Sequence, residues 1–264
     1  MFMHWFANPA RFVRLADRIL PVAMLLCFGL FATGLYWALI LSPADYQQGS
    51  SVRIMYVHVP SAYMAMFCYL VMAAAGFSTL VWRHPLADVA GKAVAPIGLA
   101  FTGLALATGS LWGKPMWGAW WVWDARLTSV LVLFFLYLGY LAIWGAFDDR
   151  SKAARAAAIL ALVGVINLPI IKFSVDWWTT LHQPASLFRA DGPRIDPSMR
   201  PPLYLMLAAF QTYFVVIFLW RMKAGLAALK LQALGAMPSP KQNHEQRHDQ
   251  HHEQNLATRT EEAL

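Results

Sequence analysis

Long apolar runs alternate with short polar segments along most of this chain. A helix needs about 20 predominantly apolar residues to cross the hydrocarbon core of a bilayer, and six stretches suit that requirement. They run over Leu20–Leu41, Ser61–Trp82, Ala93–Leu111, Leu127–Phe147, Ala156–Ile171 and Leu203–Trp220. The pattern therefore predicts an all-α, polytopic membrane protein with six transmembrane helices.

Both ends of the chain differ from this apolar region. Three arginines precede the first run, as in a signal peptide, but the run is longer than a signal h-region and five more follow, so we predict an uncleaved first helix. After Gly235 the composition changes to Gln, His, Glu, Arg and Asn, which is typical of disorder. We therefore predict a six-helix transmembrane domain over residues 1–232 and a disordered tail over residues 233–264.

Composition supports a membrane protein and argues against a soluble domain, a nucleic-acid interface and cysteine-based sites. Hydrophobic residues make up 59% of the chain and charged residues 13%, against about 25% charged in an average soluble domain. The net charge of +7 comes from short basic groups between apolar runs, which is typical of membrane-helix ends rather than of a nucleic-acid interface. Cys27 and Cys68 lack CxxC spacing, so we expect packing roles rather than a disulfide, zinc or covalent haem.

The distribution of basic residues predicts the orientation. If the N-terminus is cytoplasmic, the inner segments contain Arg11, Arg14, Arg18, Arg83, Lys92, Arg150, Lys152, Arg155, Arg221, Lys223 and Lys230. The outer segments are longer and contain fewer, namely Arg53, Lys114, Arg126, Lys172, Arg189, Arg194 and Arg200. The positive-inside rule therefore favours cytoplasmic termini, a cytoplasmic tail and outer loops on the periplasmic side.

The six spans contain no Asp, Glu, Lys, Arg or His. Ion-coupled transporters and proton pumps usually place such groups at mid-membrane, so a solute transporter is disfavoured. Pro96, Asn167 and Pro169 could bend the third and fifth helices. The chemistry is therefore expected in the outer loops.

Tryptophans are concentrated in the second outer loop, which contains Trp112, Trp117, Trp120, Trp121 and Trp123, followed by Asp124. An interfacial aromatic belt is one interpretation, but it explains five indoles in one short loop poorly. Gly113, Pro115 and Gly118 argue against simple continuation of the helix. A helical turn over residues 117–124 would put three of the tryptophans and Asp124 on one face, as a platform for a flat ligand.

Two of the eight histidines, His58 and His182, fall on the predicted outer side. Pro60 suits the first turn of the second helix, so we expect His58 just before that helix, and His182 in a loop. Either one alone could be a surface polar residue. Together, beside the tryptophans, they suggest axial ligands of a metal macrocycle, because imidazole commonly ligates haem and indoles can cover a porphyrin.

Several motifs at compatible spacing resemble one family. Residues 116–124, MWGAWWVWD, resemble the WWD signature of haem-handling membrane proteins, and ARLTS at 125–129 is similar to the haem exporter protein C (CcmC) branch of bacterial cytochrome c maturation. MYVHVPSA at 55–62, TLHQ at 180–183 and IDPSMR at 195–200 fit the same branch. The resemblance covers about residues 10–230, whereas the histidine-containing tail departs from it.

The resemblance implies a function. Family members bind haem b non-covalently at the periplasmic face of the inner membrane, with the two outer histidines, here His58 and His182, as axial ligands. The WWD loop lies against the macrocycle and corresponds here to Trp117, Trp120, Trp121, Trp123 and Asp124. They act as delivery factors rather than enzymes, although they could assist covalent attachment of haem to the periplasmic haem chaperone that receives it. Their other partners are a small single-span membrane protein and the subunits of an ATP-driven ABC transporter.

The roles of two arginines and the function each have an alternative interpretation. Arg53 and Arg126 are candidate partners of the haem propionates, because guanidinium pairs well with carboxylate, but both equally suit membrane-surface anchors. The alternative function is a membrane b-type cytochrome in electron transfer, which would more often place its ligands within the bilayer and would need a quinone or a second redox partner.

Overall fold

The structure is a computed structural model that describes residues 8–84, 86–183, 187 and 192–235. Within these residues every regular element is a helix, apart from one isolated bridge between Asp45 and Gly49. Six helical segments are long and apolar enough to cross a membrane: Pro9–Leu41, Ser50–Trp82, Ala87–Trp117, Ala125–Ala146, Arg150–Trp177 and Pro197–Gly235. The predicted all-α fold with six spans is confirmed.

All six helical segments begin before the predicted spans, and the third, fifth and sixth also end after them. The elements are α2 (Pro9–Tyr36) with the π-helical turn η1 (Trp37–Leu41), the 3-10 turn η2 (Ser50–Ile54), α3 (Met55–Trp82), α4 (Ala87–Trp117), α5 (Ala125–Ala146), α6 (Arg150–Gly164), α7 (Asn167–Trp177), η3 (Pro197–Met199) and α8 (Arg200–Gly235). Hydropathy marks only the apolar middle of a helix, whereas caps and polar turns set its ends. The chain forms two compact units, Met1–Lys223 and Ala224–Leu264, and of the predicted tail only residues 233–235 are described, as the end of α8.

The fifth span is interrupted between α6 and α7, just before Asn167 and Pro169, which we considered as positions where this helix could bend. Proline has no N–H to donate to the carbonyl four residues earlier, and its ring crowds that carbonyl. The side-chain amide of Asn167 donates to the backbone oxygen of Ser129 on α5 at 2.8 Å, so the break is tied to a neighbouring helix.

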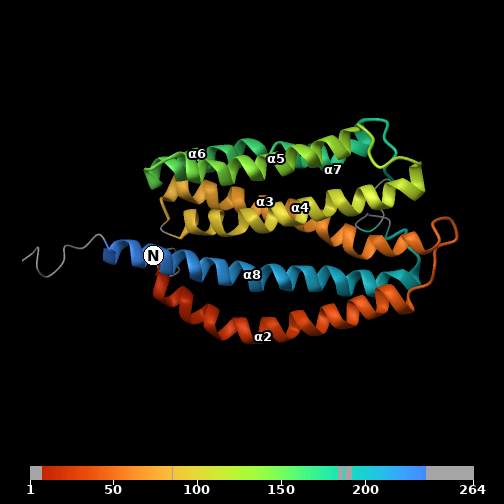
Figure 1. Ribbon diagram of the computed structural model, residues 1–264, viewed down its shortest axis with the longest axis horizontal. Coiled ribbons are helices and arrows are strands. Elements are labelled where there is room, and N and C mark those ends of the chain that lie inside the picture. The colour runs from red at the N-terminus through yellow and green to blue at the C-terminus, as the bar shows by residue number, and fades with distance from the viewer. Residues whose placement is uncertain (1–7, 85, 184–186, 188–191, 236–264) are drawn as a thin grey trace, which may run out of the picture. The chain divides into compact units, whose positions relative to one another are not determined.

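Successive spans run in opposite directions, which brings three connections together (Figure 1). Those after η1, α4 and α7 lie at one end of the helices, on the right of the figure, while those after α3 and α5 lie at the other end. The outer loops singled out in the sequence therefore share one end of the first compact unit, which we call the loop end.

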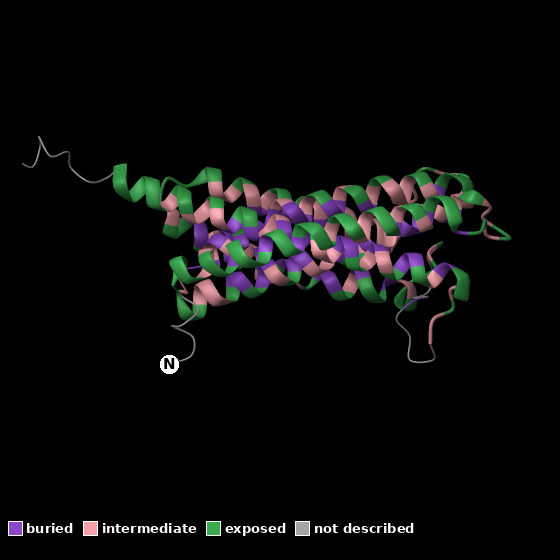
Figure 2. Ribbon diagram, turned by 90° about the horizontal axis from the view of Figure 1, so that it is seen from below, coloured by how far each residue is buried: buried purple, intermediate pink, exposed green. Residues whose placement is uncertain are grey.

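Buried residues are concentrated inside the helical assembly, and exposed residues cover its outer faces (Figure 2). Many of these exposed residues are large and apolar, including Leu25, Phe28 and Phe135. Water does not favour so much contiguous apolar surface. The hydrocarbon of a bilayer accommodates it, which agrees with the six membrane-capable helices.

A close approach between α4 and α5 illustrates the internal packing. The hydroxyl of buried Tyr137 on α5 donates to the backbone oxygen of Ala65 on α3 at 2.8 Å. Its ring lies directly against Gly98 on α4, where a Cβ atom would overlap it. Glycine at position 98 is thus required by packing.

We expect Gly98→Ala to lower the free energy of unfolding by about 1–3 kcal/mol, because overpacking forces Tyr137 or its helix to move. Denaturant unfolding in detergent measures this change. Gly29→Ala is the matched control, because no atom lies within 4 Å of a Cβ there. Equal stability of the two variants would show that Tyr137 can move without cost.

Candidate functional site

A cavity of about 410 Å³ lies at the loop end, between side chains of α3, α4, α5, α7 and the segment after α7. Its walls are mainly apolar. The polar or aromatic side chains on them include His58, Trp112, Trp117, Arg126, Lys172 and His182. The two histidines predicted as ligands therefore line one cavity.

His58 lies inside the first turns of α3, not before the helix as the sequence led us to expect, because η2 and Met55 extend the helix upstream of Pro60. Its Nδ1 is 3.0 Å from the hydroxyl of Thr108, which itself donates to the backbone oxygen of Leu104 at 2.7 Å. The hydroxyl therefore accepts from Nδ1–H, and Nε2 keeps its lone pair. The ring also packs edge-on against Trp112, with centroids 5.7 Å apart.

His182 is held by a different set of groups. Its Nδ1 lies 3.0 Å from Oδ2 of Asp124, a side chain that is only 6% exposed. The hydroxyl of Thr180 donates to the same carboxylate oxygen and accepts the backbone N–H of His182 at 3.1 Å. The imidazole packs edge-on against Trp117, with centroids 4.8 Å apart. As for His58, Nδ1 is engaged and Nε2 is the nitrogen that can bind a metal.

Asp124 caps the start of α5 as well as contacting His182 in the site. It is the N-cap of that helix, where its carboxylate accepts from the backbone N–H of Leu127 at 2.8 Å. Burial raises the pKa of this carboxyl, but the hydrogen bonds from Thr180, Leu127 and His182 outweigh burial and leave the pKa below its usual value. The group is therefore an anion at neutral pH.

The pKa of His182 is lowered from its usual value. Burial is the largest cause, and the charge of Arg126 adds to it, while Asp124 acts in the opposite direction through its hydrogen bond and its charge. The imidazole therefore stays neutral at neutral pH. Neutral imidazole is the form that binds a metal ion.

The tryptophan segment does not form the helical turn considered from the sequence. Helix α4 continues through Pro115 to Trp117 and ends at Gly118, whose φ of 74° lies in the left-handed region that favours glycine. The predicted common face of residues 117–124 is therefore wrong. Trp117 and Trp121 line the cavity, whereas Trp120 and Trp123 are 56% and 75% exposed.

The two arginines considered as propionate partners lie in different places. Arg126 is on the cavity wall and donates to the hydroxyl of Ser174 and to the backbone oxygen of Lys172, both at 3.2 Å. Arg53 donates to the backbone oxygen of Ser42 at 3.1 Å and is not among the residues that line the cavity. The geometry thus brings Arg126, but not Arg53, to the histidines.

Sequence reasoning missed several residues of the site, chiefly Thr108, Thr180, Lys172 and Gln48. The last of these accepts from Nε1 of Trp112 at 2.9 Å. Thr108 precedes the tryptophan loop by one helical turn and Thr180 precedes His182 by two residues, so nearness to the motifs was the available signal. Nearness to a motif singles out Thr108 as a candidate but does not indicate that it contacts His58, because that contact joins distant segments of the chain.

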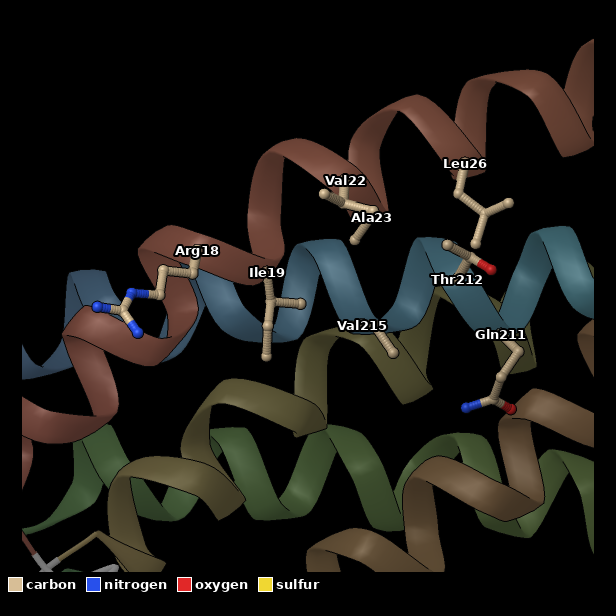
Figure 3. Close-up of a pocket in the computed structure, with 8 residues that line it drawn as sticks. All are labelled: Arg18, Ile19, Val22, Ala23, Leu26, Gln211, Thr212 and Val215. Atoms are coloured by element: carbon tan, nitrogen blue, oxygen red, sulfur yellow. The ribbon is translucent and has the colours of Figure 1, made fainter.

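A second cavity, of about 490 Å³, lies between α2 and α8 (Figure 3). Its lining is mostly aliphatic, with Arg18, Gln211 and Thr212 as polar members. The described residues that line it include neither a histidine nor a tryptophan, so they do not supply the ligands that the sequence motifs predict.

The cavity at the loop end fits haem by the chemistry of its side chains. His58 and His182 would hold the iron of a haem through their Nε2 atoms, and the macrocycle would supply the other four ligands. Among the described residues no group of three or more His, Cys, Asp or Glu could hold a bare metal ion. The indole N–H of Trp121 is buried and has no hydrogen-bond partner among the described residues, so it can donate to a polar group placed in the cavity.

Comparison with known proteins agrees with these motifs. Residues 2–236 match the family described as Heme exporter protein C. The chain is 54% identical to Heme exporter protein C of Bradyrhizobium diazoefficiens, over 96% of this chain and 95% of the relative. It is 49% identical to the protein of that name in Escherichia coli strain K12, over 84% and 89%. A putative cytochrome c biosynthesis ccmC-like mitochondrial protein of Marchantia polymorpha is 45% identical, over 77% and 86%.

Proposed function

The chain belongs to the haem exporter protein C family, and from this premise we propose that it binds haem b non-covalently in the cavity at the loop end and presents it to a periplasmic haem chaperone for c-type cytochrome biogenesis. One observation carries the proposal: His58 and His182 line the same cavity, each with Nδ1 bonded. That arrangement leaves two nitrogen ligands for one iron.

The remaining residues have distinct roles in this proposal. Trp117 and Trp121 would cover the macrocycle, because both line the cavity. Among the described residues, Arg126 and Lys172 are the cations on its wall, and they would pair with the propionates. Arg53 is tied to Ser42 away from the cavity and would act at the membrane surface instead.

Trp120 and Trp123 would contact the chaperone that receives the haem rather than the haem itself. Both are largely exposed, and Lys114 lies over the Trp120 ring at 5.9 Å from its centroid. Exposed tryptophans beside a binding cavity are suited to protein contacts, because Trp is enriched at interaction hot spots. The chaperone would therefore dock next to the bound haem.

Location and partners follow from the same premise. The protein would lie in the bacterial inner membrane, with the loop end in the periplasm and the termini in the cytoplasm. It would associate there with a small single-span membrane protein and with the subunits of an ABC transporter. No path of ionisable side chains crosses the predicted spans, so the transporter rather than this chain alone would move any solute.

A transfer assay tests the function. The purified protein, loaded with haem, is mixed with the apo form of the periplasmic haem chaperone in a membrane containing the partner proteins. We expect haem to appear on the chaperone, and the His58→Ala and His182→Ala variants to transfer much less. Reduction of the haem by quinol, with no transfer to the chaperone, would instead support the electron-transfer alternative.

Labelling of single cysteines tests the orientation. The two native cysteines, Cys27 and Cys68, are first replaced, and Tyr46→Cys or Asp148→Cys is then introduced. Position 46 lies in the loop-end connection after η1, position 148 lies in the connection after α5, and both are exposed. We expect an impermeant thiol reagent to label position 46, but not 148, in cells whose outer membrane alone is permeable. The reverse result would put the loop end in the cytoplasm.

A further inference from the structure

The two candidate ligands differ in the group bonded to Nδ1. His182 donates to the carboxylate of Asp124, whereas His58 donates to the neutral hydroxyl of Thr108, each at 3.0 Å. A carboxylate partner raises the basicity of a metal-ligating imidazole, and a charge-assisted bond is about twice as strong as a neutral one. We propose that Asp124 is the positioning residue that makes His182 the stronger axial ligand, leaving His58 as the exchangeable one. This inference rests on the proposed function.

Asp124 can position a ligand that does not itself lie on a helix. As N-cap of α5 it is fixed to the start of a regular helix through the N–H of Leu127. Thr180 joins the same carboxylate to the backbone N–H of His182. One carboxylate therefore fixes both the ring and the chain segment that carries it, and its 6% exposure keeps water from competing.

The environment of His58 offers less electronic support. Thr108 gives its own proton to the carbonyl of Leu104, so it provides His58 with only a lone pair of an uncharged oxygen. The backbone carbonyl of Ala105 is the other acceptor for this ring, and it is uncharged as well. The ring is confined sterically instead, by Trp112 and by Gly109, where a Cβ would lie 3.1 Å from Cε1 of His58. His58 is thus oriented by packing and a neutral bond, and an added ligand for iron would displace it first.

The competing explanation is that Asp124 only caps α5. Asn caps a helix N-terminus about as well as Asp, so Asp124→Asn keeps the cap and removes the charge. If capping is its only role, this variant should bind haem like the parent. If the charge supports His182, haem affinity should fall by about 10–100-fold, the usual effect of replacing such a partner.

Double-mutant cycles connect each supporting residue to its histidine. Haem affinity is measured by competition with a soluble haem-binding protein for the parent, Asp124→Asn and Thr108→Val, each also combined with His58→Ala or His182→Ala. We expect Asp124→Asn to weaken binding in the parent and in His58→Ala but not in His182→Ala. Thr108→Val should have a smaller effect, which disappears in His58→Ala.

Two further readouts separate positioning from folding. Loss of the carboxylate should raise the haem midpoint potential, because the affinity for ferric haem falls more than the affinity for ferrous haem. A tenfold difference between these two losses of affinity corresponds to about 59 mV. In the parent, added imidazole should replace His58 as the ligand of the iron. Thr108→Val should speed this exchange, because it removes the hydrogen bond between Thr108 and His58. If Asp124→Asn does not accumulate, Thr180→Val loosens the same carboxylate and should show the same coupling to His182 alone.

The outcomes distinguish this inference from the function on which it rests. If His58→Ala and His182→Ala both keep the parent spectrum, the proposed haem site is wrong. If both change the spectrum but Asp124→Asn weakens haem binding equally in the two histidine variants, only the inference fails. An equal effect of Thr108→Val and Asp124→Asn on affinity would overturn it as well.

Discussion

His182→Ala is expected to lose most of its haem, and the haem that remains should be five-coordinate. Replacing a group that merely supports a ligand typically costs 10–100-fold in affinity, so removing the ligand itself should cost at least as much. His58→Ala should also change the coordination state but retain more haem, because the carboxylate of Asp124 supports the remaining ligand. Absorption spectra and haem content of the purified variants measure both effects.

Added imidazole provides the control for folding. It should partly restore the six-coordinate spectrum of either variant, because the free ligand can occupy the space left by the side chain. His84→Ala is the matched substitution, since His84 lies beyond the other end of α3 and does not line the cavity. A parent-like spectrum in both His58→Ala and His182→Ala would mean that other residues hold the iron.

Trp121→Ala is expected to keep the six-coordinate spectrum and to lose at least tenfold in haem affinity. An indole that buries all of its ~150–250 Å² would contribute roughly 4–6 kcal/mol at ~25 cal/mol per Å². Burial of only part of that area is enough for the expected loss, because about 1.4 kcal/mol already corresponds to tenfold. Titration of the apo protein with haem measures the loss.

Trp120→Ala is the matched comparison, because this neighbouring indole is 56% exposed and does not line the cavity. We expect it to bind haem normally and to transfer haem to the chaperone poorly. The two substitutions should therefore separate haem binding from haem delivery. Equal loss of haem from both variants would contradict the division between cavity-lining and exposed tryptophans.

The sequence alone was sufficient for the six spans, because an apolar run of membrane length has few other structural solutions. It was less informative about helix ends, which polar turns determine. Pro60 suggested a helix start, yet α3 begins at Met55, and Pro115 suggested an interruption, yet α4 continues to Trp117. In the second case Gly118 is the residue that ends the helix, by its left-handed conformation.

The candidate site was predictable where its residues are adjacent in sequence, and not where distant segments meet. The histidines and the tryptophan segment were visible as motifs. The division of that segment into cavity-lining and exposed indoles depends on how α4 ends, and the pairing of His182 with Asp124 joins positions 58 residues apart. Likewise, the positions of Arg53 and Arg126 are set by tertiary contacts with Ser42 and Ser174.

The electron paramagnetic resonance spectrum of the haem-loaded, oxidised parent protein tests the central claim most directly. Two neutral imidazoles on ferric haem would form a strong axial field, so we expect a low-spin, six-coordinate signal of the bis-histidine type that is absent from both His58→Ala and His182→Ala. A high-spin signal in the parent, or a low-spin signal that survives either substitution unchanged, would contradict a haem held between His58 and His182.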